Sequence, residues 1–458
     1  MVNEEGVSIV VFGGTGDLMK RKLIPAFFSL LNKKEINLNN NIIGVGRRDF
    51  SDEQYKEFLS EEFDQTRKEE ISKMPISYFK ADFDKPNFLK ELASILESSE
   101  KDKKVNRLFY LATSYSLFPN IVQELKKKGL LKNGENWSRV VFEKPFGDNH
   151  RSFNKLDNDL HKFISEDNIY RIDHYLAKET VQNILILKYT NPLFNSILNG
   201  NFVEKIEVIV DEELNVGERL GYYHDVGAVK DMIQNHLLQV LSILIMDTPD
   251  DLNSESVHKG KVSALKSLKL LSAKEHLLGQ YSSYQKEVSL KGMVYRDTET
   301  FAKLTLASNL KKWKGSKFIL ITGKNLRKKY GQIIITFKNK DMKKHGFLKG
   351  IKENKIVIDI YPKQDIRIVL NSRKPGTLNE VNPVNFDFCQ ECVFGPNTLD
   401  EYATLLAEVI KGEKTLFTHH DELNSAWSII DKFEKIRKNV KFKIYKDKSN
   451  SEEVADEK

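Results

Sequence analysis

The stretch VSIVVFGGTGDL, residues 7–18, joins a run of apolar residues to a glycine-rich turn. The run predicts a buried strand over 7–12, and the apolar spacing beyond the turn predicts a helix over about 18–31. Glycines let a backbone turn tightly and approach a phosphate, while the following helix start offers N–H groups and a positive dipole end. A plain strand-to-helix turn is the alternative. The residues expected to bind the pyrophosphate of a dinucleotide are Gly13, Gly14, Thr15, Gly16, Asp17 and Leu18.

Further strand-like runs alternate with helical patterns in the same part of the chain. They cover residues 41–45, 76–79, 108–112 and 140–142. Ser51, with Gln54 three residues on, fits a capping box at the start of one intervening helix. Strands that alternate with helices predict a parallel, doubly wound sheet with right-handed crossovers, which is an α/β domain of the Rossmann type over residues 1–173.

The pattern changes after residue 173. Helical segments are expected at about 177–189, 226–246, 399–410 and 421–436, and strands at 205–210, 300–307, 317–321, 332–337, 355–360 and 365–370. Several strands in succession favour an antiparallel sheet. We therefore expect a C-terminal α+β domain with a large, mainly antiparallel sheet over 174–445. Residues 446–458 are polar, and we expect them to be disordered.

Composition excludes several classes of protein. The 458 residues are 40% hydrophobic and 30% charged, with a net charge of +7. The chain has no run of about 18 apolar residues, so no membrane helix is predicted. The first five residues lack the basic and apolar regions of a signal peptide, so a cytoplasmic protein is expected. Lys311, Lys312, Trp313 and Lys314 mix basic and aromatic side chains, but without a nucleic-acid-binding motif they do not predict that partner.

The chain has two cysteines, Cys389 and Cys392, in a single C-x-x-C. This spacing is typical of half a zinc site or of a redox pair. A zinc site needs two more ligands, and none is suitably spaced. We therefore expect two reduced thiols and no bound metal.

The end of the second strand bears on the choice of cofactor. It reads Gly44-Val45-Gly46-Arg47-Arg48, with no acidic residue before Asp49. Sites for NAD place an acid there for the ribose hydroxyl, whereas sites for NADP place an arginine near the 2′-phosphate. Guanidinium groups bind phosphate through forked hydrogen bonds. Arg47 and Arg48 therefore favour NADP; two solvated arginines are the alternative.

Two further stretches carry groups suited to proton transfer and anion binding. Residues 171–180 hold a carboxylate, an imidazole, a phenol and an ammonium group at a predicted strand end, where α/β proteins bind ligands. In the predicted helix 226–246, Asp231 belongs to a polar stripe, and His236 lies between that stripe and an apolar one. A lone histidine there is more often a hydrogen-bonded core residue than a base.

Four motifs resemble the glucose-6-phosphate dehydrogenase family. RIDHYLAKE is similar to the family's RIDHYLGKE, and GGTGDLMKRKLIPA to its GxxGDLxxRKxxPA. EKPFG is shared, and GYYHDVGAVKDMIQNHLLQ resembles GYYDxxGAxRDMxQNHLLQ. The resemblance runs from about residue 7 to 433. The chain departs from it at Ala177, usually glycine, at His224, usually aspartate, and at 111–115, where LATSY replaces LAxPP.

The resemblance implies roles for particular residues. His236 would be the general base and Asp173 its carboxylate partner. Lys144 and a cis Pro145 would form the corner between domains. GKNLRKK resembles the family's SGKxLxxK. The residues that would bind the sugar hydroxyls or its phosphate are His174, Tyr175, Lys178, Glu212, Asp231, Lys324 and Lys329, and Lys22 would approach both nicotinamide and substrate.

The implied activity is oxidation of glucose 6-phosphate to 6-phosphoglucono-lactone with NADP, in a homodimer or homotetramer. By the same resemblance, the domain over 174–445 would bind the substrate and form dimers. Two alternatives stay open. One is a related sugar dehydrogenase, which would not need the cations Lys178, His174 and Lys329. The other is a non-catalytic NADP-binding sensor, which would not need both Asp173 and His236.

Overall fold

The computed structural model of the chain describes residues 6–33, 42–100, 104–132, 136–339, 346–389, 392–393, 395 and 400–456. It forms two compact units, Met1–Ala177 with Thr398–His420, and Lys178–Asn397 with Asp421–Lys458. The first boundary lies four residues beyond the expected one. We did not expect residues 398–420 to belong to the first unit. They do so because α14 (Glu401–Lys411) contributes Leu405, Leu406 and Val409 to that unit's core.

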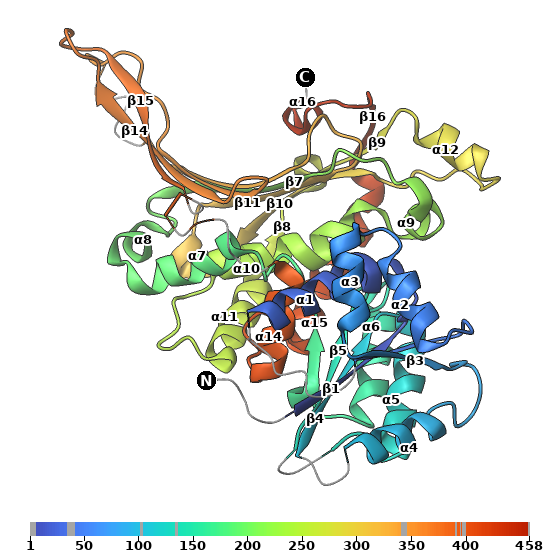
Figure 1. Cartoon of the computed structure of the whole chain (residues 1–458). Helices are drawn as coiled ribbons and strands as arrows, with labels where there is room; N and C mark the ends of the chain where they lie inside the picture. The colour runs from blue at the N-terminus through green and yellow to red at the C-terminus, as the bar shows by residue number, and fades with distance from the viewer. Residues whose placement is uncertain are drawn as a thin grey trace. The chain divides into compact units, whose positions relative to one another are not determined.

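The first unit is built on a parallel six-stranded sheet in the order β3-β2-β1-β4-β5-β6 (Figure 1). The strands are β1 (Gly6–Phe12), β2 (Ile42–Gly46), β3 (Ile76–Lys80), β4 (Val105–Leu111), β5 (Ser138–Phe142) and β6 (Ile169–Arg171). Ile9 pairs with Ile42 on one side and with Leu108 on the other. The expected doubly wound α/β fold is confirmed. Asn41, expected in the second strand, lies outside the described residues.

Helices cover this sheet because its central strands are apolar on both faces. Every residue of β1 and β4 is buried. The helices of this unit are α1 (Ile24–Asn32), α2 (Asp52–Ser60), α3 (Gln65–Lys73), α4 (Lys90–Ser99), α5 (Phe118–Lys127), α6 (His150–His161) and α14. The expected capping box is present, since the Ser51 side chain accepts from the Gln54 amide and the Gln54 side chain from the Ser51 amide. Leu399, expected to open α14, lies outside the described residues.

The second unit contains a ten-stranded sheet within the described ranges, in the order β15-β14-β13-β12-β7-β11-β10-β9-β16, with β8 on β10. The strands are β7 (Val203–Asp211), β8 (Leu268–Leu270), β9 (Leu277–Tyr281), β10 (Phe301–Ser308), β11 (Lys317–Gly323), β12 (Tyr330–Phe337), β13 (Lys355–Tyr361), β14 (Asp365–Arg373), β15 (Val381–Cys389) and β16 (Lys441–Tyr445). Only β7 with β11 and β9 with β16 pair in parallel, so the sheet is mainly antiparallel as expected. In Figure 1, β14 and β15 extend well beyond β7, β10 and β11.

The expected helix over 226–246 is three successive helical segments. α9 (Leu220–Ala228) is interrupted at Gly227, whose φ is +69°; a π-helical stretch, η5 (Val229–Leu237), follows, and α10 (Leu238–Ile245) completes the run. The C-terminal end of α10 is held by Lys188, which donates to the carbonyl oxygens of Ile243, Leu244 and Met246. The remaining helices are α7 (Glu179–Thr190), α8 (Pro192–Ile197), α11 (Ser254–Ser267), α12 (Tyr284–Leu290), α15 (His420–Ile436) and α16 (Ser451–Ala455). None of the described helices has the length and apolar character of a membrane span.

The expectation of a disordered tail is wrong for residues 446–456. They include α16, and Val454 and Ala455 are buried in an apolar cluster of the second unit with Tyr330 packed against it. The Arg327 amide also donates to the carbonyl of Ser449. Two apolar side chains and a backbone hydrogen bond thus tie this polar segment to the second unit. Residues 457–458 lie outside the described part.

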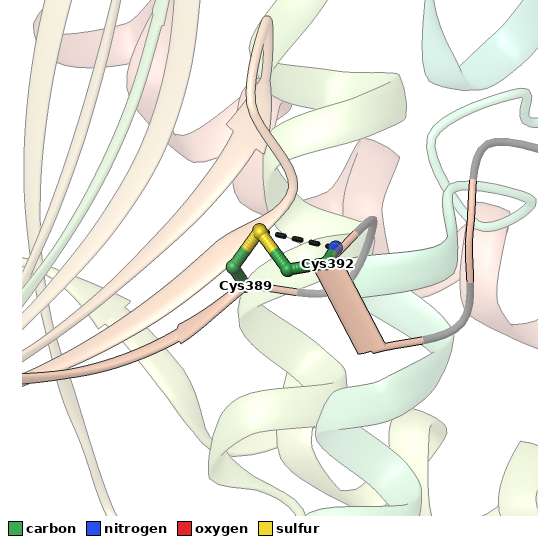
Figure 2. The surroundings of a disulfide bond; sticks show 2 residues. All are labelled: Cys389 and Cys392. Atoms are coloured by element: carbon green, nitrogen blue, oxygen red, sulfur yellow. Dashed lines mark hydrogen bonds between the residues drawn. A yellow bond between two sulfur atoms is a disulfide. The ribbon is translucent and has the colours of Figure 1, made fainter.

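The expectation of two reduced thiols is also wrong, because Cys389 and Cys392 form a disulfide (Figure 2). Their Cα atoms are 5.2 Å apart, within the range that a disulfide spans. The Cys392 amide also donates a hydrogen bond to the Cys389 sulfur.

Candidate functional site

The glycine turn connects β1 to a short π-helical stretch, η1 (Met19–Leu23), that leads into α1. Gly13 has φ +84°, and its amide and that of Gly14 both donate to the carbonyl of Val45, at 2.9 and 3.0 Å. A β-carbon on Gly14 would lie 2.7 Å from the hydroxyl of Tyr55, which donates to the Gly14 carbonyl. From the sequence, we expected these glycines to let the backbone approach a phosphate. In the structure, Gly14 also makes room for a buried tyrosine.

The two arginines at the end of β2 are exposed. Arg47 has no ion-pair partner among the described residues. The Arg48 guanidinium lies 4.9 Å from the ring centre of Phe58, which restricts its side chain. Asp49 pairs with Lys80 at 2.7 Å. The acidic group nearest the strand end is thus engaged elsewhere, and the guanidinium of Arg47 is available to an anion.

The chain leaves β6 directly into Asp173, His174 and Tyr175. Asp173 is 4% exposed, and its Oδ1 accepts from the Tyr175 amide at 3.0 Å. The rings of His174 and Tyr175 are 4.8 Å apart. The strand itself is anchored by Arg171, whose guanidinium binds Glu166 and Asp157 at 2.6 Å each. The three groups therefore follow a buried, ion-paired anchor at the carboxyl end of the sheet.

Arg171 also explains the electrostatics of this anchor. Although burial opposes it, the charge of Arg171 lowers the pKa of Glu166 to about 2. His161 lies within 4.8 Å of both carboxylates, a grouping that could hold a metal ion. Its Nδ1 contacts the Asp157 carbonyl at 2.8 Å and its Nε2 contacts Glu166 at 3.1 Å. Both ring nitrogens of His161 contact acceptor oxygens, and Arg171 pairs with both carboxylates. We therefore interpret the group as an ion-pair network.

Glu143, Lys144 and Pro145, the residues of the predicted corner, follow β5. The Lys144–Pro145 peptide is cis, as expected. Glu143 is partly buried, and the loss of solvation raises the pKa of its carboxyl; it accepts a hydrogen bond from the hydroxyl of Tyr110. Lys22, on η1, is exposed, with its ammonium 5.9 Å from the ring centre of Tyr402.

In the second unit, η5 carries Asp231 and His236, which are 2% and 0% exposed. Lys324, which follows β11, pairs with Glu212 at 2.5 Å and lies 3.8 Å from Asp231. Arg219 approaches the other oxygen of Asp231, also at 3.8 Å. The structure thus brings Glu212, Asp231 and Lys324 together, a set of two acids and a cation that suits a polyhydroxylated ligand.

A second cluster in this unit contains two of the predicted phosphate-binding residues. Lys178, which precedes α7, has its ammonium 5.2 Å from the ring centre of Tyr361, and Lys329 lies 5.7 Å from the same ring. A β-carbon on Gly331 would come within 2.6 Å of this ring, so a glycine there makes room for it. Tyr361 was missed by the sequence argument because it belongs to β13, far from every motif.

The departures from the family's motifs have local explanations. Ala177 is buried and is not among the described residues with positive φ, so its backbone accepts a β-carbon. His224 is a hydrogen-bonded core residue, with Nδ1 2.9 Å from the Tyr284 hydroxyl and Nε2 2.9 Å from the Val294 carbonyl. Its position ties α9 to the segment around α12. In the loop after β4, Ala112 donates to the Phe12 carbonyl, which holds the loop to β1 without prolines.

The predicted residues therefore fall into two groups, each ordered within its own unit. The first unit holds the turn, the two arginines, Lys22, Lys144 and the residues after β6. The second holds Lys178, Glu212, Asp231, His236, Lys324 and Lys329.

Comparison with known proteins agrees with this division. Residues 10–183 match the family described as "Glucose-6-phosphate dehydrogenase, NAD binding domain", and residues 185–458 match "Glucose-6-phosphate dehydrogenase, C-terminal domain". The chain is 35% identical to the glucose-6-phosphate 1-dehydrogenase of Borreliella burgdorferi and 33% identical to that of Bacillus subtilis, over 92% of this chain and 90% of each relative. A solved glucose-6-phosphate dehydrogenase in complex with its substrate superimposes with a TM-score of 0.89 at 30% identity, covering 98% of this chain and 96% of that one. The chain belongs to the glucose-6-phosphate dehydrogenase family and is an oxidoreductase with a nicotinamide-binding domain.

Proposed function

We propose that the chain oxidises glucose 6-phosphate to 6-phosphoglucono-lactone with hydride transfer to NADP. The observation that carries this proposal is the arrangement of Lys178 and Lys329 around the ring of Tyr361. Two ammonium groups about one ring make a site for a dianion, which a sugar without a phosphate would not need. The set of Glu212, Asp231 and Lys324 in the same unit supplies acceptors and a donor for hydroxyl groups.

The reacting hydroxyl on C1 must lose its proton as hydride leaves the same carbon. We assign this proton to His236, since an imidazole can accept a proton near neutral pH. Asp173 would be its partner, fixing the tautomer and favouring the imidazolium that forms. These two roles rest on the family's motifs, and the burial of both side chains supports them because buried groups hold one orientation.

The first unit fits a dinucleotide in three ways. Gly13 has a backbone conformation that favours glycine, Gly14 has no room for a β-carbon, and Arg47 has no ion-pair partner among the described residues. We propose that the turn 13–18 binds the pyrophosphate and that Arg47, assisted by Arg48, binds the 2′-phosphate of NADP. A nicotinamide cofactor held by these residues would supply the hydride acceptor. Lys22 and Lys144 are proposed to line the same region.

We also propose a cytoplasmic homodimer or homotetramer, assembled through the sheet of the second unit, with no nucleic acid or membrane as partner. Exposed apolar side chains on this unit support assembly: Leu370 on β14 is 39% exposed and Phe386 on β15 is 58% exposed. Such side chains in one region commonly mark an interface.

The proposal is tested by the absorbance of reduced nicotinamide with glucose 6-phosphate, with free glucose, and with each cofactor. We expect turnover with glucose 6-phosphate and NADP. Equal turnover with free glucose would favour a related sugar dehydrogenase. Binding of NADP without turnover on either sugar would favour a sensor.

A further inference from the structure

The helical run that carries Asp231 and His236 starts afresh at Gly227, where the backbone leaves helical geometry. We propose that Glu299 is a positioning residue that fixes this new start and, through it, the placement of Asp231 and His236. The inference rests on the roles proposed above for those two residues.

Glu299 satisfies the first amide groups beyond the break. The Ala228 amide donates to the Glu299 carbonyl at 2.9 Å, and the Val229 amide donates to the Glu299 Oε1 at 3.1 Å. Amide groups at a helix start have no acceptor within the helix, and side chains usually provide one locally. Here the acceptor comes from a residue 70 positions away. Its carboxylate charge also suits the positive end of the helix dipole.

The break is shaped to fit this carboxylate. A β-carbon on Gly227 would lie 2.5 Å from Oε1 of Glu299 and 2.6 Å from its carboxyl carbon. Gly227 therefore serves two purposes: it adopts a φ of +69°, and it lets the carboxylate lie against the backbone. Both the conformation and the space require glycine.

Glu299 is itself held rigidly. It is 1% exposed, and its Oε2 pairs with Arg437, which also binds Glu434 at 3.2 Å. The next residue, Thr300, donates its amide to the Gly279 carbonyl at 2.8 Å, immediately before β10 begins. A buried carboxylate persists only when it is paired, and this one is paired with Arg437. The start of the helix is thereby fixed to the central sheet.

The position of this start governs the two functional side chains. Asp231 lies two residues after Val229, and His236 lies seven residues after it, within one continuous helical stretch. A shift at the start moves both residues together, because a helix moves as a body. Displacement of a reacting group by about 1 Å can cost about 100-fold in rate.

The test compares Glu299→Ala and Glu299→Gln with a matched control, Glu434→Gln, which alters the other acid on Arg437 and leaves the cap in place. Amide hydrogen exchange reports the cap directly. In Glu299→Ala we expect exchange at Ala228 and Val229 to accelerate about tenfold, the scale of a lost helix cap. In Glu434→Gln we expect exchange at these amides to stay unchanged.

Steady-state kinetics report the positioning. For Glu299→Ala we expect kcat/KM for glucose 6-phosphate to fall about 10- to 100-fold, with an unchanged KM for NADP. Glu299→Gln, whose amide oxygen can still accept from Val229, should recover to within about fivefold of the wild type. A merely structural role would lower kcat through loss of folded enzyme and would leave both Michaelis constants unchanged.

Wild-type kinetics in Glu299→Ala, or equal losses in Glu299→Gln and Glu299→Ala, would overturn the proposal. If Glu299→Ala does not fold, Glu299→Gln and the control Glu434→Gln decide: we expect Glu299→Gln to lower kcat/KM for glucose 6-phosphate, and parity with the control would refute the inference. A wild-type enzyme without turnover on glucose 6-phosphate would instead refute the proposed function, while the exchange result would still report the cap.

Discussion

Removal of the ammonium groups beside Tyr361 should weaken binding of the phosphorylated sugar selectively. Lys178 is partly buried, and Lys329 is exposed; they lie 5.2 and 5.7 Å from the ring centre. We therefore expect Lys178→Ala to have the larger effect, since solvent and salt screen an exposed charge more strongly.

The magnitude follows from the hydrogen bonds lost. A charge-assisted bond to phosphate contributes about 1.5–3 kcal/mol, so Lys178→Ala should raise KM for glucose 6-phosphate by roughly 10- to 100-fold. Lys329→Ala should raise it by about tenfold or less. Because both ammonium groups contact one ring, the double variant should depart from additivity by about 0.5–1 kcal/mol, the scale of a cation–π contact.

The assay is a double-mutant cycle on kcat/KM, measured with glucose 6-phosphate and with free glucose at two salt concentrations. We expect the losses on the phosphorylated sugar to shrink at high salt and the values for free glucose to stay close to wild type. Equal losses on both sugars would show that these lysines do not bind the phosphate.

Three further results are expected. Arg47→Ala combined with Arg48→Ala should lower the NADP-to-NAD ratio of kcat/KM by tenfold or more, the effect of about one charge-assisted bond, and an unchanged ratio would refute the second-strand argument. Lys188→Met should lower the free energy of unfolding by about 3 kcal/mol in a denaturant titration, because three carbonyl groups lose a buried donor, and a change below ~1 kcal/mol would contradict this. Burial raises the pKa of Asp211 to about 7, so the folded state binds a proton that the unfolded state has released, and stability should fall as pH rises from about 4 to 7. Asp211→Asn should remove that part of the pH dependence in equilibrium unfolding, and parallel curves for variant and wild type would refute the assignment.

Much of the fold was predictable because many of its strands are continuous apolar runs or alternate apolar with polar residues. The strands at 7–12 and 205–210 correspond to β1 and β7 within one or two residues. β15 was missed although Val384, Phe386 and Phe388 alternate with polar residues, because its asparagines and Pro383 are unfavourable in a strand. α16 was missed because its apolar contacts come from only Val454 and Ala455 in a polar segment. Such elements form through tertiary contacts that local patterns do not contain.

The predicted site residues came from motifs, which record residues close in sequence. The residues that support them come from distant segments: Tyr361 lies near two motif lysines, and Glu299 accepts from an amide at the start of the helix of Asp231. Neither carries a local signal, since a tyrosine in a strand and a glutamate before a strand are ordinary. The cysteine pair was misjudged because its spacing fits both thiols and a disulfide, and only the distance between the two residues in the folded chain decides between them.

The most direct test of the account is the rate at which His236→Asn reduces NADP with saturating glucose 6-phosphate. The asparagine keeps a hydrogen-bonding side chain but cannot accept the proton from the C1 hydroxyl. The account predicts a loss of about 10²- to 10⁴-fold in kcat, with KM for the sugar close to the wild-type value. Turnover close to that of the wild type would contradict the assignment of His236 as the general base.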